Sequence, residues 1–180
     1  MLTPLHRSAA APALQVLPRH GTAPGATPQG WPLLRLGFRP FYLAASAWAV
    51  LALALWAAML AGWVALPSEH ATARNPVLWH AHEMLFGFAA TVVVGFVLTA
   101  AKAWTGLATA RGPALGALVL LWLGARATAL GGPYLLHALL DVALLPAVAL
   151  QLLVVLLRAR NRRNLPLVGL LLVLGSANAA

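Results

Sequence analysis

The feature that most constrains the fold is a series of long apolar runs that charged residues hardly interrupt. The first clear run, FYLAASAWAVLALALWAAMLAGWVAL, covers about residues 41–66. Roughly 18 such residues are enough for a helix that crosses a membrane. The whole chain is 62% hydrophobic and only 8% charged, whereas a soluble domain carries about a quarter charged residues. We therefore predict an integral membrane protein whose main surroundings are a lipid bilayer.

The runs predict an all-α fold, a polytopic transmembrane helix bundle with four full spans and a truncated fifth. Pro113 and Pro133 suit the first turn of a helix, where no amide donor is needed. Pro146 falls inside the fourth span, where we expect a kink. The four predicted spans cover about residues 41–66, 79–101, 113–131 and 133–158.

The two ends of the chain have different compositions. Residues 1–32 are rich in Ala, Pro and Gly, which indicates a disordered N-terminal tail, and residues 33–180 form the predicted transmembrane domain. A fifth apolar segment opens at Leu165 and reaches the last residue, Ala180. A helix of that length rises only about 24 Å, less than the roughly 30 Å hydrocarbon core. We therefore expect the N-terminal part of a larger protein, with a C-terminal half missing.

Basic residues in the predicted loops indicate the orientation. Arg35 and Arg39 precede the first span, Lys102 and Arg111 lie between the second and third, and an arginine cluster at 158–163 follows the fourth. The loops on the other side hold only Arg74. Positive charges favour the cytoplasmic side, so we predict a multi-pass protein of the bacterial inner membrane with a cytoplasmic N-terminus.

Several functional classes receive no support from the residues. The net charge of +9 could suggest nucleic acid, but the basic residues cluster at span ends rather than on one basic face with aromatic platforms, so no nucleic-acid partner is expected. The chain has no cysteine, which excludes disulfides and thiolate ligands. We also find no nucleophile–base pair and no nucleotide-binding loop, so an enzymatic activity is neither predicted nor excluded.

The predicted topology brings polar residues from separate spans into one layer on the outer side. An intramembrane carboxylate such as Asp141 costs roughly 2.5–3.5 kcal/mol on insertion scales, so we expect Arg126 or His137 to pair with it. That pairing could be purely structural, and Arg126 could instead reach the headgroups. The residues of this layer are His80, His82, Glu83, Arg126, His137 and Asp141.

A regular helix predicts which of these side chains share a face. At 100° per residue, His80 and Glu83 lie on one face, while His82 is turned about 200° away from His80. We therefore expect His80 and Glu83 to face protein and His82 to meet headgroups or another subunit. The face of His80 continues through Gly87, Thr91, Gly95 and Thr99, a ladder of small residues that lets a neighbouring helix approach closely.

An imidazole and a carboxylate recur together on two spans, as His80 with Glu83 and His137 with Asp141. Metal-ligating histidines usually donate their second ring nitrogen to such a partner. The candidate metal ligands are therefore His80, His82 and His137, with Met84 as a soft ligand that suits copper. Glu83, Arg126 and Asp141 are candidates for supporting residues or charge partners. The same groups could instead relay protons in a transporter or a proton-conducting subunit without a cofactor.

Four motifs in order resemble the NnrS family. They are LLRLGFRPFYL (33–43), WHAHEMLFGF (79–88), GFVLTA followed by WTG (95–106), and RARNRRNLP (158–166). The resemblance runs from about Leu33 to the C-terminus. Family members usually carry a Pro-Asn pair before WTG, where this chain has Lys102 and Ala103.

The NnrS family comprises multi-spanning bacterial membrane proteins that are described as containing haem and copper. The resemblance implies a role in the response or resistance to nitric oxide, that is, to nitrosative stress in bacteria capable of denitrification. It also implies haem and copper as cofactors, without assigning them to particular histidines. The competing hypothesis remains a transporter or proton-conducting subunit.

Overall fold

A computed structural model describes residues 31–66 and 75–179 of the chain. The predicted tail up to residue 30 lies outside the described residues. The described part is helical throughout, as predicted. Its elements are the 3-10 helix η1 (Pro32–Arg35), α1 (Phe38–Leu60), α2 (Pro76–His82), the π-helix η3 (Glu83–Ala89), α3 (Ala90–Thr105), α4 (Pro113–Ala129), α5 (Tyr134–Arg158), the 3-10 helix η4 (Arg162–Asn164) and α6 (Pro166–Asn178).

The second predicted span is one continuous helix made of α2, η3 and α3 (Pro76–Thr105). It begins where the side-chain Oδ1 of Asn75 accepts hydrogen bonds from the backbone N–H groups of Val77 and Leu78. It ends at Gly106, whose φ of 70° is the left-handed conformation that glycine adopts without a steric cost. The middle of this helix is the wider π-helical turn η3. This geometry is rare in proteins overall, and where it occurs it is often at a functional site.

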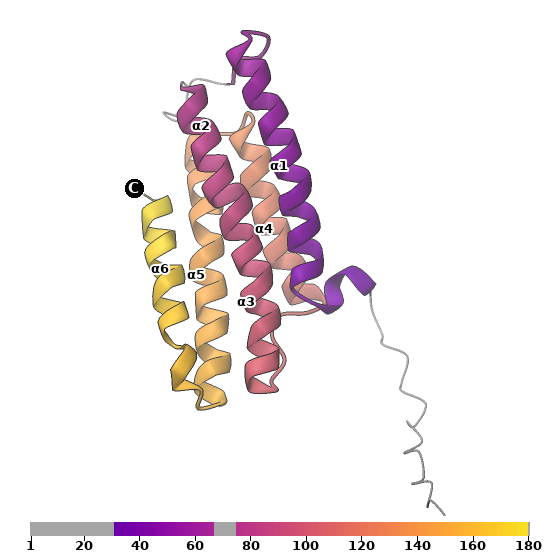
Figure 1. Ribbon diagram of the computed structural model, residues 1–180, viewed down its shortest axis with the longest axis vertical. Helices are drawn as coiled ribbons and strands as arrows, with labels where there is room; N and C mark the ends of the chain where they lie inside the picture. The colour runs from indigo at the N-terminus through magenta and orange to yellow at the C-terminus, as the bar shows by residue number, and fades with distance from the viewer. Residues whose placement is uncertain (1–30, 67–74, 180) are drawn as a thin grey trace, which may run out of the picture.

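The helices lie roughly parallel to one long axis (Figure 1). The continuous helix α2–η3–α3 lies between α1 on one side and α5 on the other, and it contacts both. Helix α4 packs on α5, and α6 covers the other side of α5 at the edge of the bundle. This arrangement surrounds the second span with protein on two sides, so several of its faces are buried.

The observed helices lie close to the predicted spans but differ in length. Three helices are long and apolar enough to cross a membrane, namely Phe38–Leu60, Pro76–Thr105 and Tyr134–Arg158. The third predicted span became α4, whose 17 residues rise only about 26 Å. Helix α6 has 13 residues. Pro146 lies inside α5 without ending it.

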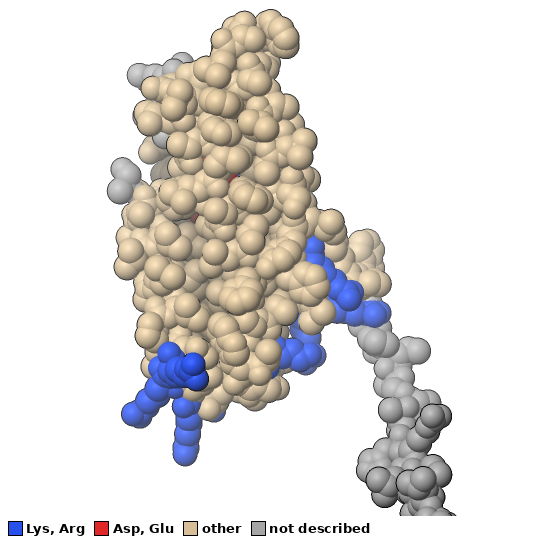
Figure 2. All heavy atoms as spheres, viewed as in Figure 1, with Lys and Arg blue, Asp and Glu red and all other residues tan. Residues whose placement is uncertain are grey.

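The basic side chains gather at one end of the bundle. Figure 2 shows them at its lower end, where the chain passes between α3 and α4 and between α5 and α6, and where η1 lies. We call this end the basic end. Its residues are Arg35, Arg39, Lys102, Arg111, Arg158, Arg160, Arg162 and Arg163. The gathering agrees with the loop pattern in the sequence, and a cytoplasmic location for this end remains a prediction.

The predicted ladder of small residues does face a neighbouring helix. A Cβ atom on Gly95 would lie 3.0 Å from the Tyr42 ring and 3.1 Å from Phe41 Cβ, both on α1. Thr99 Oγ1 accepts a hydrogen bond from the backbone N–H of Phe38 at 3.0 Å. The ladder therefore brings α1 and α3 together, a packing role.

Candidate functional site: a buried polar cluster

Glu83 is the centre of a polar cluster in the end of the bundle opposite the basic end. It opens the π-helical turn, and its side chain is only 1% exposed. Its Oε2 accepts hydrogen bonds from Trp48 Nε1 on α1 at 2.7 Å and from Arg126 Nη1 on α4 at 2.5 Å. A buried carboxylate needs such partners, because an unpaired charge would cost several kcal/mol away from water.

Arg126 joins the two carboxylates of the described residues. Its second terminal nitrogen, Nη2, pairs with Oδ1 of Asp141 in the second turn of α5. Arg126 is 3% exposed and Asp141 is 8% exposed, so both charges are withdrawn from solvent and lipid. Arg126 therefore holds α4 against both the π-helical turn and α5, through charge-assisted hydrogen bonds that are stronger than neutral ones.

His82 connects the same two carboxylates from the other side. Its Nδ1 lies 3.4 Å from Glu83 Oε1, and its Nε2 lies 3.3 Å from Asp141 Oδ2. Asn178 on α6 completes the contact, with its Oδ1 3.0 Å from His82 Nε2. The amide nitrogen of Asn178 donates to Asp141 Oδ2 at 3.0 Å. Five helices, with α2–η3–α3 counted as one, thus contribute to one polar cluster, which consists of Trp48, His82, Glu83, Arg126, Asp141 and Asn178.

The hydrogen-bonding pattern around His82 has a chemical consequence. Both ring nitrogens face oxygen atoms. A neutral imidazole donates from one nitrogen only, whereas an imidazolium donates from both. A neutral His82 ring can therefore donate to the oxygen atoms on only one of its two sides, whereas a ring with N–H groups on both nitrogens donates to both sides.

Gly87 provides the space in which this cluster forms. A Cβ atom at this position would lie 2.7 Å from Glu83 Oε2, 2.7 Å from Trp48 Nε1 and 2.8 Å from Arg126 Nη1. Those distances are well inside van der Waals contact, so any side chain here would displace the three groups that meet at Glu83. The small residue is a steric requirement of the cluster.

The other two candidate histidines, His80 and His137, have contacts of their own. His80 stacks on Trp56 of α1, with 4.3 Å between ring centroids and 17° between ring planes. Its Nδ1 is buried and has no hydrogen-bond partner. His137 Nδ1 lies 3.1 Å from the backbone oxygen of Ala125, and its ring lies 6.4 Å from that of His82.

The structure corrects the predicted orientation of His82. We expected this side chain to meet headgroups or another subunit, but it faces α5 and α6 and contacts both carboxylates. His80 and Glu83, expected on one face and facing protein, both contact tryptophans of α1, namely Trp56 and Trp48. Trp48 and Asn178 belong to the cluster and were not predicted. Asn178 lies in the short fifth segment, where a polar residue at the end of an apolar run was the available signal. Met84 packs against the hydrophobic core and is partly buried.

The side chains fit the two implied cofactors differently. Within the described residues, no group of three or more His, Asp or Glu side chains is arranged to hold a metal ion. Between Glu83 and Asp141, the Arg126 guanidinium already occupies the position that a cation would take. A haem needs only one or two axial imidazoles, and the unpaired Nδ1 of His80 is a donor atom without another role.

The fold and the cluster define a helical membrane protein with an ionised network buried among its helices. The family model of the NnrS protein matches residues 32–180. The chain belongs to the NnrS family, as the motifs predicted. No curated protein and no solved structure matches the chain.

Proposed function

We propose that this chain acts in the bacterial response to nitric oxide and binds haem through an imidazole on the second span. Membership of the NnrS family carries the proposal, because the family is described as containing haem and copper and as linked to nitric oxide. A bound haem would supply an iron atom that binds small diatomic molecules. The residues of this chain would hold the group and keep water away from it.

His80 is the best candidate for the residue that would hold the haem. Its Nδ1 is buried without a hydrogen-bond partner, and an unpaired buried polar atom is costly unless something binds it. The stacked Trp56 ring fixes the plane of the imidazole. His82 is a weaker candidate, because both of its nitrogens already contact Glu83, Asp141 and Asn178.

His137 is the second candidate. Its Nδ1 lies within hydrogen-bond distance of the Ala125 backbone oxygen, and a contact of this kind orients many metal-bound imidazoles. Copper would need further ligands besides these imidazoles, with Met84 as the soft donor that the sequence suggests. The polar cluster would then have a supporting role, since it fixes the helices that carry both histidines.

The test is an optical spectrum of the purified full-length protein together with the His80→Ala, His137→Ala and His6→Ala variants. We expect a haem Soret band in the parent protein and in His6→Ala, which removes an imidazole from the N-terminal tail. The band should shift or disappear in His80→Ala. Metal analysis of the same samples should show iron in proportion to the band.

Two outcomes would overturn the proposal. If the purified full-length protein binds neither haem nor copper, the transporter or proton-conducting hypothesis replaces it. If haem binds equally well in both histidine variants, the axial ligands lie elsewhere and the assignment to His80 and His137 fails.

A further inference from the structure

We propose that the chain between α5 and α6 binds the phosphate group of an anionic phospholipid. A cavity of about 260 Å³ opens at this place, lined by Leu156, Leu157 and Leu165 together with Arg160 and Arg162. The leucine side chains can contact the acyl chain of a lipid, and the two adjacent guanidinium groups can bind its phosphate. Arginine is well suited to a phosphate because its planar fork donates two hydrogen bonds at once.

The position of the cavity along the bundle suits a headgroup. Helix α5 has 25 residues and spans about 37 Å, so its end extends beyond a hydrocarbon core of roughly 30 Å. Arg158 is its last residue, and the cavity lies directly after it. Leu157, which lines the cavity, is 57% exposed and presents an apolar surface to an acyl chain.

The end of α5 places Arg160 in the left-handed backbone conformation, which an arginine adopts only at a steric cost. Its φ is 53°, and it alone among the described non-glycine residues has a positive φ. The backbone N–H of Asn161 donates to Leu156 O and that of Arg160 donates to Leu157 O, which is the Schellman pattern that usually places glycine at this position. Arginine there costs stability relative to glycine, and such strain accumulates where a side chain has a function.

Charge around the cavity also favours an anion. Arg158 and Arg163 flank the two lining arginines in the chain, and Figure 2 shows basic side chains projecting from this corner of the bundle. Both carboxylates of the described residues lie in the polar cluster at the other end, bound to Arg126. No acidic side chain of the described part can therefore neutralise these arginines.

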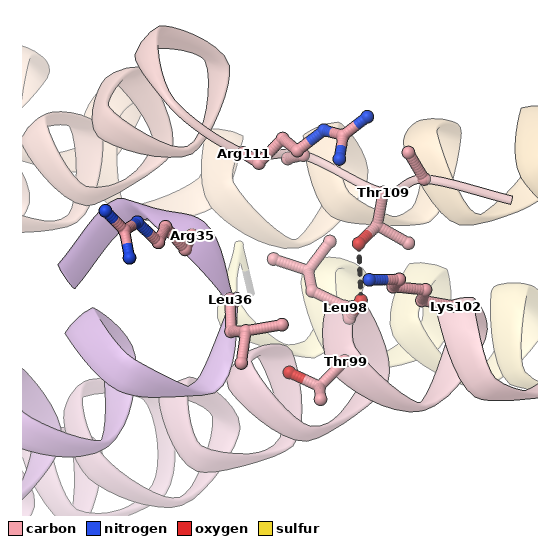
Figure 3. A pocket seen from close by; sticks show the side chains of 10 residues that line it. Arg35, Leu36, Leu98, Thr99, Lys102, Thr109 and Arg111 are labelled. Atoms are coloured by element: carbon pink, nitrogen blue, oxygen red, sulfur yellow. Dashed lines mark hydrogen bonds between the residues drawn. The ribbon is translucent and has the colours of Figure 1, made fainter. Parts of the chain in front are cut away.

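A second basic pocket at the same end provides the natural control. Figure 3 shows Arg35, Lys102 and Arg111 around it, brought together where the Gly112 N–H donates to Leu34 O. Its volume is only about 20 Å³, which suffices for one water-sized group and not for a phosphate. The guanidinium groups of Arg35 and Arg111 point to opposite sides in this view. Removing these charges lowers the charge of the basic end without altering the larger cavity.

The experiment uses the full chain, purified in detergent and freed of lipid, with phosphatidylglycerol or phosphatidylcholine of the same acyl chains added back. The site variant is Arg160→Gly/Arg162→Gln and the control is Arg35→Gln/Arg111→Gln, each lacking two charges. Bound lipid is counted by native mass spectrometry, and thermal unfolding is followed in parallel. The single variant Arg160→Gly should raise Tm by a few degrees without lipid, which shows that the fold survives the change.

We expect the parent protein to prefer phosphatidylglycerol and the site variant to bind it about tenfold more weakly. The control should lose less than about twofold. An equal loss in both double variants would overturn the proposal, because binding would then follow the total charge of the basic end. An equal response to phosphatidylcholine would also overturn it, and so would displacement of the lipid by millimolar inorganic phosphate, which would identify a free anion as the ligand.

Discussion

Arg126 on α4 and Glu83 in the π-helical turn form a buried ion pair, with 2.5 Å between Nη1 and Oε2. Both side chains are at most 3% exposed. The pair joins segments 43 positions apart in sequence, and Asp141 on α5 shares the same guanidinium. The helices that carry the candidate histidines are therefore held together by charge as well as by apolar packing.

Replacing Arg126 with Gln should destabilise the protein by about 3–5 kcal/mol, because two buried carboxylates would lose their shared cation. The measurement is thermal unfolding of the purified protein in one detergent, with expression yield as a second readout. The double variant Arg126→Gln/Glu83→Gln is the informative partner. It should recover part of the loss, since it removes one unpaired charge. A double variant less stable than Arg126→Gln would contradict the assignment of an ion pair.

A methyl group at Gly87 should displace Glu83 and its partners. Overpacking of this kind costs about 1–3 kcal/mol, and a Cβ would lie within 2.8 Å of three polar atoms. Gly169→Ala is the matched control, because a Cβ on that helical glycine meets nothing within 4 Å. We expect a clear fall in Tm for Gly87→Ala and little change for Gly169→Ala. Equal effects would show that Gly87 has no steric role.

The periodicity and charge of the sequence predicted much of this architecture. Long apolar runs indicate membrane helices because each backbone polar group must be satisfied within the helix. The observed helices begin or end within a few residues of most predicted limits. The cost of a buried carboxylate predicted a partner for Asp141, and Arg126 provides it. These inferences need only the local sequence and the fact that successive spans cross the membrane in opposite directions.

The orientation of His82 could not be predicted in the same way. A helical wheel gives the angle between side chains and does not say which neighbour lies at each angle. The second span has α1 on one side and α5 on the other, so His80 and His82 both face protein although they point in different directions. Trp48 and Asn178 were missed because their partners come from distant parts of the chain, and the sequence of a single span does not identify those partners.

Asn178 should fix α6 to the rest of the bundle. Its side chain contacts His82 and Asp141, whereas the hydroxyl of Ser176 bonds only to Leu172 O within its own helix. We expect Asn178→Leu to raise amide hydrogen exchange in Pro166–Asn178 by about tenfold, for a loss of roughly 1–1.5 kcal/mol. Ser176→Ala should leave the exchange nearly unchanged. Unaltered exchange in Asn178→Leu would show that apolar contacts alone hold α6.

Two tryptophans on α1 allow the hydrogen bond to Glu83 to be separated from apolar burial. Trp48 Nε1 donates to Glu83 Oε2, whereas Trp56 Nε1 is buried without a hydrogen-bond partner. Phe retains an aromatic ring at either position but has no N–H, so Trp48→Phe removes a bond to a charged acceptor and Trp56→Phe removes none. We expect Trp48→Phe to cost about 1.5–3 kcal/mol more than Trp56→Phe, measured by thermal unfolding in the same detergent. Since Phe preserves an aromatic surface against His80, the Trp56 variant should also retain any haem band. Equal losses of stability in the two variants would mean that the Trp48 N–H does not help to hold Glu83 beside Arg126 and His82.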